Sequence, residues 1–207
     1  MQTTNITQLV LATGNTGKLR EMQALLQGLN IEVLPQSHFN VSECPEPHCT
    51  FIENALAKAR HASLLTGLPA LADDSGLCVE ALQGAPGVFS ARYACETAEQ
   101  EKSDAANNAK LLKALENAEN RFAYYYCVMV LVRHANDPQP LISEGIWVGE
   151  ILKVPRGTGG FGYDPLFLDA KTEQTGAELA PEIKNRICHR GHALNKLLLK
   201  LENINHG

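Results

Sequence analysis

Two neighbouring aspartates, Asp73 and Asp74, are the residues of this chain whose types most directly suggest chemistry. They lie in the segment Leu71-Ala72-Asp73-Asp74-Ser75-Gly76-Leu77, between an apolar stretch and a Ser-Gly pair. Adjacent carboxylates repel each other and are costly to bury, so a metal ion or a proton transfer is one reason to keep them together. An Asx-type turn, closed by Ser75 and Gly76 where a strand ends, is the other. The pair alone leaves a site and a turn equally open.

The segment Thr13-Gly14-Asn15-Thr16-Gly17-Lys18 has the composition of an anion-binding turn. An apolar stretch at 6–12 predicts a buried strand before it, and apolar residues at helical spacing predict a helix after it (Leu19, Met22, Leu25, Leu26, Leu29). The N–H groups and positive dipole of that helix start, together with Lys18, favour phosphate. The spacing is not that of a Walker A loop, and Leu19 stands where that motif needs Ser or Thr. A tight turn without a ligand is the alternative.

A second helix is predicted to begin at Thr50, because Thr50-Phe51-Ile52-Glu53 fits a capping box, and to end at Gly67. The capping box alone is enough to explain Glu53. The side chains of Asn54, Lys58 and His61 share one polar face of this helix. Lys58 would point at a phosphate if that face lines a cleft, and would otherwise be an ordinary surface lysine.

The segment Gly157-Thr158-Gly159-Gly160-Phe161-Gly162 formally fits G-x-G-x-x-G, but the residues at 163–168 favour extended chain. A dinucleotide-binding fingerprint needs a helix there, so we reject that interpretation. The loop instead offers Phe161 or Tyr163 for stacking on a base. Three donors of the loop before the last helix could read a keto oxygen, or could simply be a basic stretch (Lys184, His189, Arg190).

Composition limits the function classes. The chain has 207 residues, 44% of them hydrophobic and 20% charged, and a formal net charge of -5, which argues against an extended nucleic-acid surface but not against a small anionic ligand. The six cysteines form no C-x-x-C pair, and the polar start at 1–5 has no signal-peptide pattern, so we expect reduced thiols and a cytoplasmic protein. A zinc site at Cys44–Cys49 is a weak alternative because no second ligand pair follows. The apolar runs are too short to span a bilayer.

The remaining pattern predicts an α/β fold. β-rich segments at 122–133 and 142–154 are expected to pair as a hairpin, a polar helix is expected from about 97 to 116, and leucines mark a terminal helix at 192–201. We find no repeat and no separate linker. One compact unit with a cleft between two groups of strands is the simplest architecture.

Taken together, six motifs resemble the inosine triphosphate pyrophosphatase family, in its bacterial dITP/XTP branch. The resemblance runs from about residue 8 to about residue 200, with the motifs in the family's order. They are Thr13–Lys18, Phe51–Ala55 with Lys58-Ala59-Arg60, Ala72–Leu77, Gly84–Gly87 with Ser90–Tyr93, Gly159–Pro165 and His189-Arg190-Gly191.

This resemblance implies a fold, an activity and partners. The fold would be an elongated, two-lobed α/β domain over residues 1–207, with a long central mixed β-sheet flanked by helices and a central active-site cleft. The protein would be a cytoplasmic homodimer that uses Mg²⁺. It would hydrolyse the deaminated purine nucleoside triphosphates ITP, dITP and XTP to the monophosphate and pyrophosphate, and so clean the nucleotide pool.

The resemblance also implies residue roles. Asp74 would be the proton acceptor and, with Glu46, a metal ligand, while Asp73 would support its neighbour. Lys58 and Lys18 would stabilise charge on the leaving pyrophosphate. The other substrate contacts would be the triphosphate loop, one serine and the nucleoside-binding group (Thr13, Gly14, Asn15, Thr16, Gly17; Ser75; Phe161, Gly162, Tyr163, Asp164, Lys184, His189, Arg190).

Two departures from the family's pattern bear on base selectivity. Cys188 stands where a serine is usual, and Ile183 breaks a usual acidic pair. Cysteine is the weaker hydrogen-bond partner. Competing functions are a pyrophosphatase for modified pyrimidine triphosphates and a non-catalytic purine-nucleotide binding protein. A P-loop kinase is a third, against which the loop spacing argues.

Overall fold

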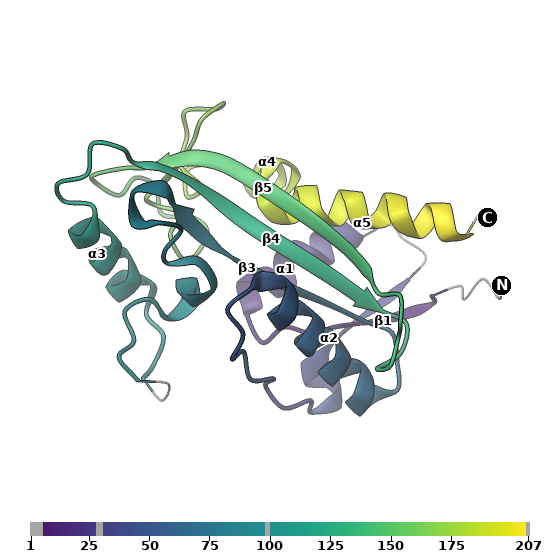
Figure 1. The fold of residues 1–207 in the computed structure, drawn as a ribbon. Helices are drawn as coiled ribbons and strands as arrows, with labels where there is room; N and C mark the ends of the chain where they lie inside the picture. The colour runs from purple at the N-terminus through teal and green to yellow at the C-terminus, as the bar shows by residue number, and fades with distance from the viewer. Residues whose placement is uncertain (1–5, 28–30, 98–99, 206–207) are drawn as a thin grey trace. The chain divides into compact units, whose positions relative to one another are not determined.

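The computed structural model describes residues 6–27, 31–97 and 100–205; Leu29 and the polar start at 1–5 lie outside the described residues. The elements in chain order are β1 (Gln8–Leu11), α1 (Thr16–Leu26), β2 (Glu32–Pro35), η1 (Gln36–Phe39), α2 (Phe51–Thr66), β3 (Ala70–Val79), η2 (Glu80–Leu82), η3 (Gly87–Arg92), α3 (Asp104–Ala114), β4 (Phe122–Val132), β5 (Leu141–Ile151), β6 (Phe167–Asp169), α4 (Pro181–Ile187) and α5 (His189–Asn205). Figure 1 shows their course.

A six-stranded mixed sheet organises the chain, in the order β2-β1-β3-β4-β5-β6. The strand β1 is parallel to β2 and to β3, while β5 and β6 are antiparallel. The predicted strands at 122–133 and 142–154 are confirmed as the sheet neighbours β4 and β5. Helices flank this sheet, so the predicted α/β class is confirmed.

The chain forms two compact units. The first comprises 1–74, 127–145 and 190–207, and the second comprises 75–126 and 146–189, so the boundaries fall inside or next to elements and not in a linker. Each unit has its own apolar core. The core of the first includes Leu9, Met22, Leu71, Met129 and Leu194, and that of the second includes Leu77, Leu111, Trp147, Phe167 and Leu179. That residues 1–207 act as a single domain stays a prediction.

Local signals explain both helices at the start of the first unit. The Asn15 side chain caps α1 by accepting from the Lys18 N–H at 3.0 Å, and Thr50 caps α2 by accepting from the Glu53 N–H at 3.4 Å. Gly67 ends α2 with a φ of 70°, a conformation that favours glycine. Within this unit α2 lies on one side of the strands, and α1 and α5 lie on the other (Figure 1).

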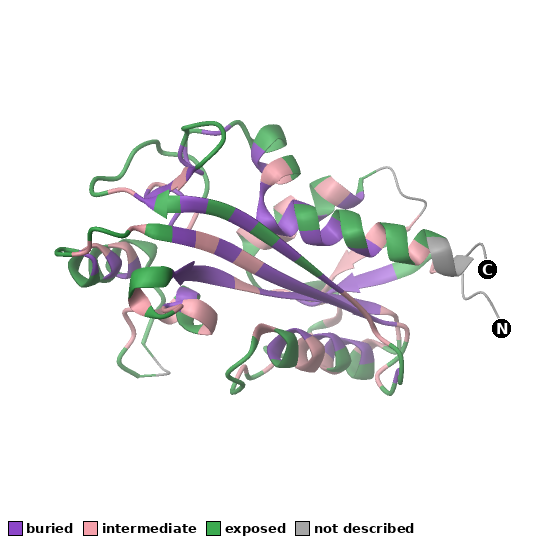
Figure 2. Cartoon of the chain, turned by 45° about the horizontal axis from the view of Figure 1, so that its top comes forward, coloured by how far each residue is buried: buried purple, intermediate pink, exposed green. Residues whose placement is uncertain are grey.

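The Asp pair is not in a turn, contrary to one of the two sequence interpretations. Both aspartates lie inside the ten-residue strand β3, which continues through Ser75 and Gly76 to Val79. Almost every residue of β3 is buried, whereas β5 alternates between buried and exposed residues (Figure 2). The glycine of the Ser-Gly pair has a role other than a turn, namely close packing: a Cβ atom at Gly76 would lie 2.2 Å from the Gly87 carbonyl oxygen. This glycine therefore admits a neighbouring segment and does not turn the chain.

Other element boundaries also differ from the prediction. The helix expected at 97–116 is shorter, because the Ser103 side chain caps α3 at Asp104. The terminal helix begins at His189, three residues before the predicted start. Residues 163–166 form a turn, so the extended chain expected there begins only at Phe167. No helix in the described part of the chain is long and apolar enough to cross a membrane.

Candidate active site

The two aspartates of β3 serve opposite faces of the strand. Consecutive strand residues point to opposite sides, and here Asp73 meets Lys18 of α1 whereas Asp74 meets Lys58 of α2, each at 3.0 Å. The expected repulsion between neighbouring carboxylates is relieved because each has its own cation. The two aspartates are therefore adjacent in the backbone but have separate surroundings, one on each side of the strand.

Asp73 is held by fixed positive charges. Lys18 Nζ lies 3.0 Å and Arg190 Nε 3.4 Å from its Oδ2 atom, and Arg190 also forms an ion pair with Glu21. Burial alone would raise the pKa of Asp73, but the charges of Lys18, Arg190 and Lys58 hold this pKa well below its ordinary value. A carboxylate of this kind stays ionised and is a poor proton acceptor.

Asp74 has the opposite character. Its Oδ1 atom accepts from Lys58 Nζ at 3.0 Å and its Oδ2 atom accepts from Asn54 Nδ2 at 3.2 Å. Burial raises the pKa of Asp74, and the nearby charge of Glu46 adds to this, against the opposing effect of Lys58 and Lys18. A carboxylate with a raised pKa is the stronger base, so Asp74 is the better suited of the two to take a proton.

Lys58 joins Asp74 to the loop that precedes α2. Its Nζ atom lies 2.6 Å from Glu46 Oε1, as well as 3.0 Å from Asp74 Oδ1. Burial lowers the pKa of Lys58, but the charges of Asp74, Asp73 and Glu46 outweigh it and hold this pKa above its ordinary value. The side chain is therefore an ammonium ion between two carboxylates.

This arrangement fits a hard divalent cation. Two carboxylates from different segments, Glu46 and Asp74, already converge on one positive charge, and oxygen ligands are what Mg²⁺ prefers. Among the described residues, no group of three or more His, Cys, Asp and Glu side chains is arranged to hold a metal. A cation bound by Glu46 and Asp74 would take its other ligands from water or phosphate, as Mg²⁺ commonly does.

The predicted phosphate loop has the expected local form. Thr13 Oγ accepts from the Asn15 N–H at 3.2 Å, and Gly14, Asn15 and Thr16 are exposed. Thr16, Gly17 and Lys18 form the first turn of α1 and do not belong to a free loop. The Lys18 side chain extends from this turn to Asp73. Anion binding at this helix start stays a prediction.

The second unit holds another cluster of predicted residues. Lys184 Nζ lies 2.6 Å from Asp164 Oδ2 and 4.8 Å from the centre of the Phe161 ring. The Phe161 N–H donates to the same Asp164 oxygen at 2.8 Å. His189 stacks on Tyr125, with ring centres 4.7 Å apart and an interplanar angle of 8°. An aromatic ring, a cation and a carboxylate thus lie together.

Three expectations about these residues need correction or sharpening. Lys184, His189 and Arg190 do not share a loop, because the first lies in α4 and the other two begin α5. They also divide between the units, since Arg190 belongs to the first and is only 2% exposed. Tyr163 is 3% exposed and its hydroxyl donates to the Ser90 carbonyl, which leaves Phe161 as the more accessible ring. Contacts of Ser75 and Gly162 with a substrate stay predictions.

Sequence reasoning missed residues that support the site. Asn54 was placed on the polar face of α2 without a role, yet it bonds Asp74. In the second unit Asp104 accepts from the Gly162 N–H at 2.7 Å, and Asn108 donates to the Gly162 carbonyl at 2.9 Å. The residues next to Asp104 and Asn108 in the sequence do not indicate these two contacts, because Gly162 is more than fifty residues away.

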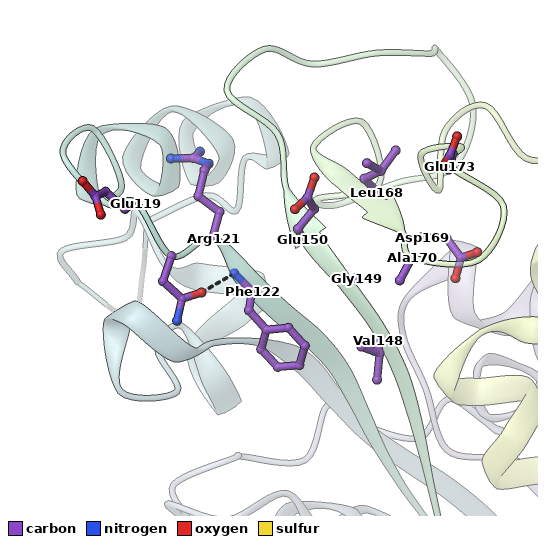
Figure 3. A pocket seen from close by; sticks show the side chains of 11 residues that line it. Glu119, Arg121, Phe122, Val148, Gly149, Glu150, Leu168, Asp169, Ala170 and Glu173 are labelled. Atoms are coloured by element: carbon purple, nitrogen blue, oxygen red, sulfur yellow. Dashed lines mark hydrogen bonds between the residues drawn. The ribbon is translucent and has the colours of Figure 1, made fainter.

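A pocket of about 500 Å³ in the second unit is lined by none of the predicted site residues (Figure 3). The charged groups of Arg121 and Asp169 on its wall serve the fold. The Arg121 guanidinium donates to the backbone carbonyls of Leu115, Ile151 and Leu152, and Asp169 accepts from Trp147 and from the turn after β6. The two clusters described above are therefore the better candidates for a functional site.

Fold and site together define an α/β protein whose carboxylate–lysine cluster suits phosphate chemistry. The chain belongs to the Ham1 family, whose model matches residues 9–200. Its relatives include proteins called dITP/XTP pyrophosphatase. That of Chromobacterium violaceum is 61% identical over 195 residues, which are 94% of this chain and 97% of the relative. That of Burkholderia pseudomallei is 59% identical over 197 residues, 95% of this chain and 94% of the relative.

Solved structures of Ham1 proteins and of a nucleoside-triphosphatase are also similar to this chain. A HAM1 protein from Coxiella burnetii is 50% identical, with a TM-score of 0.86 over 96% of this chain and 100% of the other. A nucleoside-triphosphatase, also called dITP/XTP pyrophosphatase, from Mycobacterium abscessus is 39% identical, with a TM-score of 0.72 over 92% of this chain and 98% of the other. The resemblance inferred from the six motifs is thus confirmed at the level of the family.

Proposed function

We propose that this protein is a nucleoside-triphosphate pyrophosphatase that hydrolyses deaminated purine nucleotides, dITP, XTP and ITP, to the monophosphate and pyrophosphate. The names of its relatives support the substrate class. The observation that carries the chemistry is the unequal pair on β3, where Asp73 is held ionised and Asp74 has a raised pKa beside a lysine shared with Glu46. Removal of such nucleotides would keep the pool of DNA and RNA precursors clean.

In this proposal Asp74 accepts a proton from the water that attacks phosphorus, or holds that water in place. The bond to the departing pyrophosphate breaks as the new P–O bond forms. Lys18 and Lys58 stabilise the negative charge that builds on the leaving group. The start of α1, with exposed Gly14, Asn15 and Thr16, receives phosphate oxygens through its N–H groups.

Glu46 and Asp74 would hold Mg²⁺ in this proposal, supported by the convergence of both carboxylates on Lys58 Nζ. A bound Mg²⁺ supplies neutralisation of phosphate charge. The chain's own contribution is the placement of the carboxylates, one from β3 and one from the loop before α2. Asp73 contributes by keeping Lys18 in position.

Base recognition falls to the second cluster in this proposal. Phe161 offers a ring for stacking, and Lys184 and His189 offer donors to a keto oxygen, which an exocyclic amino group would not satisfy. Arg190 is included as a reader of the base, as the family resemblance implies. The changes at Cys188 and Ile183 bear on the selectivity among ITP, dITP and XTP. A homodimer in the cytoplasm, built from single-domain chains, completes the proposal.

One experiment tests the proposed activity. The full chain is incubated with Mg²⁺ and a panel of ITP, dITP, XTP, ATP and modified pyrimidine triphosphates, and pyrophosphate release is measured against orthophosphate release. We expect pyrophosphate and monophosphate from the three deaminated purines and little from ATP. Preference for a pyrimidine would favour the pyrimidine pyrophosphatase. Binding of ITP without any release would favour a nucleotide-binding protein, and orthophosphate as the product would refute the proposal.

A further inference from the structure

Asn54 has an unusual position for a polar side chain. It lies in the first turn of α2 but is only 2% exposed. Its carboxamide makes three hydrogen bonds within the first unit. The oxygen accepts from the His48 N–H at 3.2 Å, and the nitrogen donates to the His48 carbonyl at 3.3 Å and to Asp74 Oδ2 at 3.2 Å. A buried amide with three hydrogen-bond partners is held firmly in place, because leaving any of these groups unpaired would cost free energy.

These partners fix the orientation of the amide. The His48 N–H is a donor and the oxygen is the only acceptor of a carboxamide, so the amide oxygen must face His48 N. The two protons of the nitrogen are then directed at a carbonyl oxygen and a carboxylate oxygen, both acceptors only. Reversing the amide would oppose oxygen to oxygen twice. Asn54 is therefore locked between the backbone of His48 and the carboxylate of Asp74.

The segment held by His48 is the one that carries Glu46. Residues 41–49 form no helix or strand, so their place depends on side-chain contacts with neighbouring elements. Three side chains of α2 supply them. His61 lies 3.0 Å from the Ser42 carbonyl oxygen, near the start of the segment. Lys58 binds Glu46 directly, and Asn54 binds the backbone of His48, two residues after Glu46. Asn54 and Lys58 lie four residues apart, on the same face of the helix. Each also bonds a different oxygen of Asp74, Oδ2 and Oδ1 respectively.

We propose that Asn54 is a positioning residue that sets the separation of the Glu46 and Asp74 carboxylates, and hence the affinity for a divalent cation. The inference rests on the proposed function, in which these two residues bind the metal. Lys58 cannot do this alone, because its ammonium competes with a cation for the same carboxylate oxygens. Asn54 is neutral and bonds Asp74 Oδ2, so it does not occupy Oδ1, the oxygen that Lys58 binds and for which a cation would compete.

The test measures metal binding without nucleotide. Mn²⁺ is titrated into the full chain and free Mn²⁺ is followed by electron paramagnetic resonance, for the parent, Asn54→Ala and Asn54→Ser. We expect a loss of affinity of about 10- to 100-fold, as for other residues that orient metal ligands. Serine is well tolerated near a helix start and is too short to reach both partners, so this variant carries the test if the alanine variant does not fold.

Glu53→Ala is the matched control. Glu53 is the adjacent residue in the same turn and bonds Thr50, so its loss weakens the helix cap without touching Asp74. We expect its Mn²⁺ affinity to stay within about twofold of the parent, whatever its thermal stability. A second readout is kinetic: for Asn54→Ser the Mg²⁺ concentration giving half the maximal rate should rise, while kcat at saturating Mg²⁺ should stay within a few-fold of the parent.

The outcomes separate the inference from the proposed function. Mn²⁺ affinity within about twofold of the parent in both Asn54 variants would overturn the positioning role, while pyrophosphate release by the parent left the proposed function intact. An equal loss in Glu53→Ala would also overturn it, because general weakening of α2 would then explain the effect. A parent chain that binds no Mn²⁺ would overturn both the inference and the metal assignment.

Discussion

Replacing Lys58 by methionine should destabilise the protein strongly in the absence of a divalent cation and much less in its presence. Methionine keeps the length and most of the apolar stem of lysine but removes the charge. Asp74 and Glu46, which now share that ammonium at 3.0 and 2.6 Å, would face each other without a counter-ion. Mg²⁺ could then take the place of the lost charge.

The size of the effect follows from the geometry. Two unit charges 3 Å apart attract by about 5 kcal/mol at an effective dielectric constant of about 20, and desolvation offsets part of this. Removing one partner of a buried ion pair typically costs about 3–5 kcal/mol. Because the Glu46 side chain is 28% exposed and water can partly solvate it, we expect the low end, about 3 kcal/mol.

Urea unfolding at neutral pH, with EDTA or with saturating Mg²⁺, measures this difference. A ligand at 100 times its Kd stabilises the folded state by about 2.7 kcal/mol. Mg²⁺ should raise the free energy of unfolding of the parent by less than this, because Lys58 competes with the metal for the same carboxylate oxygens. The difference in free energy of unfolding between Lys58→Met and the parent should therefore decrease by about 2 kcal/mol when Mg²⁺ is added.

Lys196→Met is the control for the loss of a lysine. Lys196 is exposed and its Nζ atom donates to the Glu144 carbonyl at 2.9 Å, so its loss should change the free energy of unfolding by about 0.5 kcal/mol or less. If Lys58→Met cost no more than this control in EDTA, the buried ion-pair reasoning would be refuted. If Lys58→Met lowered the free energy of unfolding equally with and without Mg²⁺, the idea that Mg²⁺ replaces the charge of the Lys58 ammonium would be refuted.

Three further predictions concern single residues. Asp74→Asn should lower the rate of pyrophosphate release by at least about 100-fold while ITP binding stays measurable by calorimetry; near-parental hydrolysis would exclude Asp74 as the base. Arg190→Ala should reduce the preference for ITP over ATP in kcat/KM, and unchanged selectivity would move base reading to other residues. Hydrogen bonds from Arg133, against the effect of burial, hold the pKa of Asp137 well below its ordinary value. The ion pair therefore stabilises the fold above the unfolded carboxyl pKa of about 4, and this contribution is lost as pH falls through the lower folded value. Asp137→Asn should thus cost about 1 kcal/mol at pH 7, and the cost should shrink in urea unfolding at pH 3 and below.

The sequence predicted those parts of the fold that are encoded locally. The capping residues Asn15 and Thr50 and the end of α2 at Gly67 lie within a few positions of the elements they define. The strands β4 and β5 were found because long runs of β-forming residues identify strands well. In each case the physical cause is contained in one short window of sequence.

Features that depend on distant packing were not predictable in the same way. A Ser-Gly pair after two aspartates is typical of a turn, and only the Gly87 carbonyl, eleven residues further along, shows that Gly76 makes room for a neighbour. Arg190 meets Asp73 across 117 positions and Glu21 across 169. The types of the site residues were therefore readable from their motifs, but their partners required the fold.

The placement of Asp73 and Asp74 on opposite faces of β3 has a consequence for chain length. Inserting one residue between Ala72 and Asp73 would direct Asp73 toward α2 and Asp74 toward α1, because strand side chains alternate with a period of two. Each carboxylate would then meet the surroundings of the other. Single substitutions elsewhere in β3 leave this assignment intact, whereas an insertion or deletion of one residue ahead of Asp73 in the strand reverses it. The orientation of the two carboxylates therefore depends on the number of residues that precede them in β3, and not on the types of the other residues in the strand.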